Sequence, residues 1–270
     1  MKRIIICIFL LTVNSILLIA LDFKMVENNC CLRNGDSIHY DFITAIVPQS
    51  SSFSEQLWDF SNSKYLGQEK EVFFVGNDSN RIKMIAKDAI LDFSQDKDRL
   101  LLKHLQTPLL NIDFGNSFEY LKFPFSLNDS LTCQIEGKGT YCSKNKLVLS
   151  GTCCTKAMAK GKLIMPYNDS LNNTLLIQRN IVANINVSKD SLMSVRQDEP
   201  VKFNAAIFEW YAMEYRYPIL KVIEASIKKG ERKVLDQFFA YLFMSVEEIG
   251  VLHASFFFTL HPSPFGSECR

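Results

Sequence analysis

The chain has 270 residues, of which 47% are hydrophobic and 12% aromatic, so it can build the core of one large β domain or two small ones. Its 30 basic and 29 acidic residues give a formal net charge of +1. This balance excludes a global electrostatic attraction to nucleic acid or to an anionic membrane surface.

The N-terminal segment has the pattern of a secretory signal. Lys2 and Arg3 precede an apolar run from Ile4 to Leu21, as in the charged and apolar regions of a signal peptide. We therefore expect residues 1–21 to be a signal peptide, with an uncleaved membrane anchor as the alternative, because Leu18-Ile19-Ala20 is a poor cleavage site. The expected location is the periplasm, the outer envelope or the extracellular space, with membrane contact only through this segment.

Alternating apolar residues mark the first strands. Ile38, Tyr40 and Phe42 alternate with polar residues, which is the period of a half-buried strand. Short strands are also expected at residues 57–60 and 71–75, where β-branched and aromatic residues cluster.

The segment from Ile82 to Asn111 has no decisive period. It fits an amphipathic helix or short strands, and periodicity alone does not separate the two. Strands are the expected structure because the rest of the chain is β-like. A further strand is expected at residues 118–125, where Pro124 places it at a sheet edge.

Export makes the cysteines interpretable, since oxidising compartments permit disulfides. Gly137-Lys138 has the Gly-X form of a two-residue type II′ turn, which would place Cys133 opposite Cys142. In such a pair the Cα atoms lie about 4.5 Å apart, a separation that a disulfide tolerates. We predict a Cys133–Cys142 disulfide, and the alternative is two half-buried cysteines without a bridge.

A β-rich stretch runs from Ala157 to Leu220. It begins with a hairpin that turns at residues 168–170. The following strand alternates cleanly, so one face is expected to be core and the other solvated. The predicted core positions of this strand are Ile181, Ala183, Ile185 and Val187.

The aromatic block at residues 203–217 has large side chains on both faces, as in a strand that passes between two layers. Its aromatic residues are the candidate ligand-binding side chains, as a platform on which a sugar stacks: Trp210, Tyr211, Tyr215 and Tyr217. The alternative is that they pack in the core. A turn is expected at residues 228–231, and residues 233–243 repeat apolar side chains at helical spacing.

Several motifs together resemble a family of uncharacterised secreted proteins that is common in Bacteroidetes. The motifs are GDSIHYDFI with WDFSN, LLKH with FPFSLNDSL, GKLIMP with LLIQR, and EWYAMEYRYPIL, and they span most of residues 35–243. The resemblance implies an exported β protein and a strand at residues 233–243 despite their helical period, and it brings no catalytic residues. Asn128 and Glu214 stand where the family tends to have glycine, and we expect no C-terminal sorting domain of the kind that many relatives carry.

No catalytic motif is recognisable in the sequence. The four histidines form no HExxH pattern, and no GxSxG motif is present. Glu209 and Glu214 do not suit an acid/base pair, because their odd spacing places them on opposite faces of one strand. We therefore expect no enzyme activity, no cofactor and no metal site.

These observations predict an all-β fold, an antiparallel β-sandwich or a partly open barrel. A single domain at residues 30–260 would lie between the signal segment and a tail at residues 261–270. The expected function is that of a non-enzymatic exported envelope or cell-surface protein with a structural or interaction role, whose partner would be a glycan or an envelope protein. The alternative is a carbohydrate- or lipid-binding module, which a deep apolar cavity or an exposed aromatic strip would favour.

Overall fold

The computed structural model describes residues 24–26, 30–45, 55–78, 80–166, 169–188 and 200–248. The predicted signal segment at residues 1–21 and the tail at residues 261–270 lie outside the described residues. The described residues form β-strands over most of their length, so the predicted all-β class is confirmed.

Thirteen strands follow one another along the described residues. They are β1 (Asp36–Ile43), β2 (Glu55–Asp59), β3 (Tyr65–Asp78), β4 (Arg81–Ala86), β5 (Ile90–Asp96), β6 (Arg99–Gln106), β7 (Leu110–Lys122), β8 (Ser130–Tyr141), β9 (Asn145–Ile164), β10 (Ser170–Ser188), β11 (Val201–Tyr211), β12 (Leu220–Lys229) and β13 (Arg232–Glu248). The ambiguous segment at residues 82–111 is therefore made of strands, as expected. The helical spacing at residues 233–243 is overridden because β13 pairs along both of its edges, with β12 and with β1.

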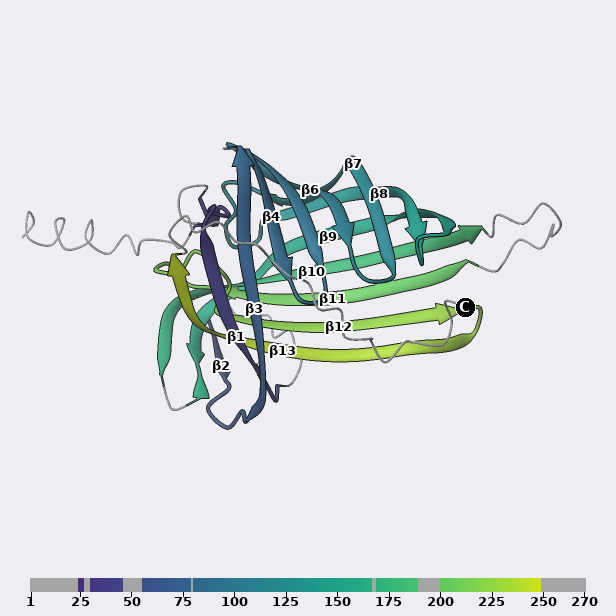
Figure 1. Ribbon diagram of the computed structural model, residues 1–270. Coiled ribbons are helices and arrows are strands. Elements are labelled where there is room, and N and C mark those ends of the chain that lie inside the picture. The colour runs from purple at the N-terminus through teal and green to yellow at the C-terminus, as the bar shows by residue number, and fades with distance from the viewer. Residues whose placement is uncertain are drawn as a thin grey trace, which may run out of the picture.

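Twelve of these strands close into an antiparallel barrel. Neighbouring strands pair in the order β10-β11-β12-β13-β1-β3-β4-β5-β6-β7-β8-β9, and β9 pairs again with β10 to complete the ring. In Figure 1, β10 to β13 run as long strands along one wall and β4 to β8 cross them on the other. The predicted barrel is thus closed rather than partly open. Each of these strands has two paired neighbours, although β7 and β8 pair with each other only through Leu110–Asp113 and Lys138–Tyr141.

The inner face of the barrel is mostly apolar, and the outer face is mostly polar where no second layer covers it. On β8 the outward positions are exposed and the inward Ile135 is 1% exposed. The alternation predicted for the strand at residues 181–187 is confirmed, since Ala183 is buried and Ile181, Ile185 and Val187 pack against the interior cluster. The asparagines between them face outward and are exposed. The hydrophobic pattern therefore selects one face of the closed sheet for the core.

The hairpin between β8 and β9 turns at residues 142–144 rather than at Gly137-Lys138. Positive φ angles of 50° at Cys142 and 57° at Ser143 reverse the chain there. Gly137 instead lets β8 approach β7 closely, because a Cβ atom at this position would lie 2.7 Å from Ile112 Cγ2. The predicted type II′ turn is wrong because the glycines serve close strand packing within a continuous strand.

A second layer covers part of the outer face. β2 lies outside the ring and pairs in parallel with β9. Trp210 on β11 is fully buried between the layers, and its ring meets Trp58 and Phe60 edge to face, with ring centroids 6.1 and 5.5 Å apart. This layer is the only part of the sandwich prediction that the described residues match. It explains why the aromatic block carries large side chains on both faces.

Candidate functional site

Three charged side chains meet inside the barrel. Arg179 on β10, Glu209 on β11 and Lys221 on β12 come from neighbouring strands, and Glu209 is directly opposite Lys221 in the antiparallel register. The Lys221 ammonium lies 2.6 Å from Glu209 Oε1, and Arg179 Nη1 lies 3.0 Å from Glu209 Oε2. The side chains of Arg179 and Glu209 are 0% and 2% exposed. A buried carboxylate is thus held between two cations.

All three groups are ionised at neutral pH. Burial by itself would raise the pKa of Glu209, but Lys221 and Arg179 together outweigh it and lower that pKa to about 2. Burial would lower the pKa of Arg179 and of Lys221, whereas the carboxylate of Glu209 contributes to raising both above their ordinary values. Two cations and one anion give this cluster a net charge of +1.

Tyrosine side chains surround the charged cluster. The Arg179 guanidinium carbon lies 3.6 Å from the ring centroid of Tyr120 on β7, and Arg179 Nη2 donates to the Tyr120 carbonyl at 3.2 Å. Burial raises the pKa of Tyr40 and of Tyr211, so both hydroxyls stay protonated. Among the residues that the structure describes, the buried Arg179 Nε has no hydrogen-bond partner.

An apolar cavity of about 370 Å³ lies beside this cluster, inside the barrel. Its volume is within the range of small-molecule sites in proteins. Apolar side chains from β5 to β11 form most of its wall, among them Phe93, Leu102, Phe114, Ile135, Leu149 and Ile181. Four charged residues also line it, namely Lys70, Glu209, Arg216 and Lys221. The cavity therefore combines a long apolar wall with a localised polar region.

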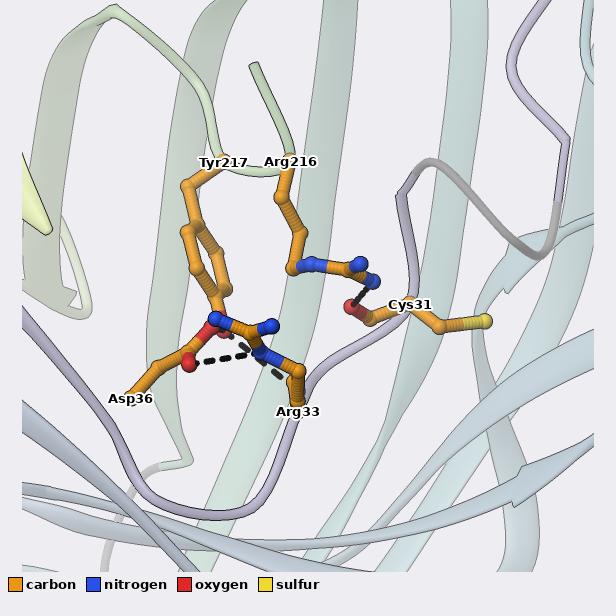
Figure 2. A network of polar contacts seen from close by, with 5 residues as sticks. All are labelled: Cys31, Arg33, Asp36, Arg216 and Tyr217. Carbon is orange, nitrogen blue, oxygen red and sulfur yellow. Dashed lines mark hydrogen bonds and ion pairs between the residues drawn. The ribbon is translucent and has the colours of Figure 1, made fainter. Parts of the chain in front are cut away.

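The segment around Cys31–Asp36 is fastened to the loop between β11 and β12. The Tyr217 hydroxyl donates to Asp36 Oδ2 at 2.7 Å, and Arg33 Nε donates to Asp36 Oδ1 at 2.8 Å. Arg216 Nη1 donates to the Cys31 carbonyl at 2.9 Å. Figure 2 shows these side chains converging from the two segments. Since Cys30, Arg216 and Tyr217 also line the cavity, the network closes one side of it.

The four aromatic residues predicted to bind a ligand do not form an exposed platform. Trp210, Tyr211 and Tyr217 are 0%, 6% and 3% exposed, and Tyr215 is half-buried. β11 ends at Tyr211, so Tyr215 and Tyr217 lie in the following loop and share no strand face with it. The prediction of an exposed aromatic platform is therefore wrong. Tyr211 and Tyr217 line the interior cavity instead, and their role in ligand binding stays a prediction.

The predicted Cys133–Cys142 disulfide is also wrong. Cys133 is a free thiol directly opposite Cys153, because the hairpin turns several residues later than expected. A hydrogen bond from the Cys153 thiol lowers the pKa of Cys133 to about 7, against the opposing effect of burial. Cys153 donates this hydrogen bond, and its own pKa is raised, first by the hydrogen bond and then by burial.

The charged cluster was missed because none of its members forms a sequence motif. Glu214, five positions after Glu209, does not belong to the cluster and is exposed in the loop after β11. The alternation of side chains along a strand could have indicated the cluster. Arg179 falls on the same strand face as Ile181, and Glu209 falls on the same strand face as Ile207. An ionisable residue at an inward position has to be paired, so parity alone marks these positions as unusual.

Within the described ranges, no group of three or more His, Cys, Asp or Glu side chains is arranged to hold a metal ion. No helix of the described residues is long and apolar enough to cross a membrane. Comparisons with known protein families, curated proteins and solved structures found no match to this chain. The resemblance to a secreted Bacteroidetes family therefore stays a prediction.

Proposed function

We propose that this chain is an exported, non-enzymatic envelope protein whose barrel binds a small apolar ligand. The observation that carries the proposal is the apolar cavity of about 370 Å³ inside the closed sheet. Its wall has the composition of a ligand site, with many hydrophobic and aromatic side chains and a few convergent polar groups. Of the two ligand classes expected from the sequence, the apolar wall favours a lipid over a carbohydrate, because sugar hydroxyls would find few partners along it.

The test is binding of the uncharged dye N-phenyl-1-naphthylamine to the purified full chain, followed by its fluorescence. We expect saturable binding at one site, since the dye gains fluorescence when it leaves water for an apolar interior. Organic extraction of the purified protein, with mass spectrometry of the extract, would identify any lipid that copurifies. A folded protein that binds no dye would leave only the structural role expected from the sequence.

A matched pair of variants separates interior from surface binding. Ile181 lines the cavity, whereas the next residue, Val182, points outward and is 58% exposed. Ile181→Trp fills part of the cavity and is expected to abolish dye binding, whereas Val182→Trp adds the same side chain to the outer face and is expected to leave it unchanged. Circular dichroism checks that both variants keep their β structure. Equal binding by the two variants would place the dye outside the barrel and contradict the proposal.

A further inference from the structure

The charges that line the cavity are unbalanced. Lys70, Arg216 and Lys221 are cations, and Glu209 is the only acidic residue among the described residues that line the cavity. Arg179 adds a further cation directly behind Glu209. Lys70 has a partner at the surface, since its ammonium lies 3.2 Å from Asp88 Oδ1. Arg216 donates to the Cys31 carbonyl, and it shares a neighbouring pocket with Arg33, Asp36 and Glu214. The interior therefore holds more positive than negative charge.

Lys221 has hydrogen-bonding capacity left over. An ammonium group carries three donors, and among the described residues Lys221 has one acceptor, Glu209 Oε1. Its side chain is 25% exposed, in contrast to the fully covered Arg179. Lys221 shares its strand face with Ile223, and both line the cavity, so the Lys221 side chain is directed into the barrel.

Two tyrosine side chains add hydroxyl groups to the cavity that Lys221 lines. Tyr40 and Tyr211 line the same cavity as Lys221, and their raised pKa values keep both hydroxyls protonated. A hydroxyl can donate to an anion. Two tyrosines that can donate a hydroxyl hydrogen and one lysine ammonium thus line a single cavity. Charged groups in a low-dielectric interior call for a counter-charge, which the described residues do not supply.

The apolar part of the cavity continues away from this polar end. Phe203 and Glu209 both line it from β11, six positions apart, which corresponds to about 20 Å along an extended strand. The residues between them on the same face, such as Ile207, are apolar. A ligand that matches this arrangement has one polar end and a long apolar remainder.

We propose that the ligand is an amphiphile with an anionic headgroup, a carboxylate on an apolar chain, and that Lys221 receives the carboxylate with the hydroxyls of Tyr40 and Tyr211. This inference rests on the proposed ligand-binding function and adds its headgroup chemistry. Glu209 and Arg179 hold Lys221 in place, and the ligand supplies the missing negative charge. The alkyl chain lies along the wall that includes Ile207 and Phe203.

The experiment compares dodecanoate with dodecanol as competitors for N-phenyl-1-naphthylamine bound to the full chain at neutral pH. The two competitors share one alkyl chain and differ only in headgroup. We expect the wild-type protein to bind dodecanoate about 10- to 100-fold more tightly, the ratio that corresponds to one hydrogen bond between charged groups. Lys221→Met is expected to lose this preference while still binding dodecanol, and Lys221→Arg is expected to keep it.

The outcomes separate the two proposals. Equal binding of both competitors by the wild-type protein would overturn the headgroup inference and leave the proposed function standing. Failure of the dye to bind the wild-type protein would overturn the proposed function itself. A preference that survives in folded Lys221→Met would show that Lys221 does not receive the headgroup. If Lys221→Met does not fold, Tyr40→Phe removes only one hydroxyl and is expected to lower the preference severalfold.

Discussion

Lys221 and Glu209 face each other across an antiparallel pair of strands, with 2.6 Å between the ammonium nitrogen and a carboxylate oxygen, inside a closed sheet whose inner face is mostly apolar. The carboxylate is held from its other side by Arg179. Removing one member of such a buried set costs more than the pair itself contributes, because the remaining charges lose their partner while they stay away from water.

Replacing Glu209 with glutamine is expected to destabilise the protein strongly. The change leaves Arg179 and Lys221 as two cations without a counter-charge, which typically costs about 3–5 kcal/mol of unfolding free energy. Urea unfolding followed by circular dichroism measures it. The control is Glu214→Gln, since Glu214 is exposed and its replacement is expected to cost no more than about 0.5 kcal/mol. Similar losses for the two variants would show that the buried ion cluster adds little to stability.

The stabilising effect of Glu209 is expected to depend on pH at the acidic end. Its pKa is lowered from 4.5 to about 2 in the folded protein, so its contribution is fully present above the unfolded value. That contribution declines as the pH falls from about 4.5 toward 2, because the unfolded chain takes up the proton first. The difference in unfolding free energy between wild type and Glu209→Gln should therefore be constant near neutral pH and shrink below about pH 4. A difference in unfolding free energy that stays unchanged down to pH 2 would be incompatible with a lowered pKa of the Glu209 carboxyl group.

Cys133 is expected to be an unusually acidic thiol. Its pKa is lowered from 9.0 to about 7, first through the hydrogen bond from Cys153. Alkylation by iodoacetamide, followed by mass spectrometry of the Cys133 peptide, should reach half its maximal rate near pH 7, because only the thiolate reacts. Cys153→Ala removes the donor and should move the midpoint upward, whereas Cys153→Ser keeps a donor and should move it less. A wild-type midpoint near pH 9 would argue against the hydrogen bond.

The network in Figure 2 is expected to hold the segment around Arg33–Asp36 against the barrel. Tyr217→Phe removes the hydroxyl that donates to the buried Asp36, and an unsatisfied buried acceptor typically costs about 1–3 kcal/mol. Amide hydrogen exchange should accelerate at residues 30–36 more than in β5 or β6, because the opening is local.

Tyr215→Phe is the matched control for this variant. Tyr215 lies in the same loop, and its ring packs edge to face on Phe243, with ring centroids 5.7 Å apart. Losing its hydroxyl should change exchange little. Comparable acceleration in the two variants would mean that the Tyr217 bond to Asp36 does not fasten the segment.

Local patterns in the sequence predict much of the fold. The alternation at residues 181–187 places the correct residues inside, because a strand directs successive side chains to opposite faces whatever its neighbours are. The turn at residues 228–231 is confirmed between β12 and β13, where Gly230 has a φ of +57°. Such features depend on a few adjacent residues, so a single sequence contains enough information to place them.

Features that depend on approach between distant strands could not be predicted in this way. Gly137 has the pattern of a turn, but its missing side chain accommodates Ile112 on β7, which lies 25 positions earlier in the chain. Because the turn lies at residues 142–144 rather than at Gly137-Lys138, Cys133 is opposite Cys153 and not opposite Cys142. The register of a hairpin follows from the position of its turn, so one wrong turn misplaces every cross-strand pair beyond it.

By itself, the sequence determined that the chain forms alternating strands with one apolar face, since that property resides in the spacing of side chains along each strand. Only the tertiary structure decided that the strands close into a ring and that Arg179, Glu209 and Lys221 meet inside it. The three residues lie on separate strands, and Arg179 and Glu209 are 30 positions apart in the chain. Their meeting depends on inter-strand register, which is set by packing across the whole barrel and leaves no motif in the sequence.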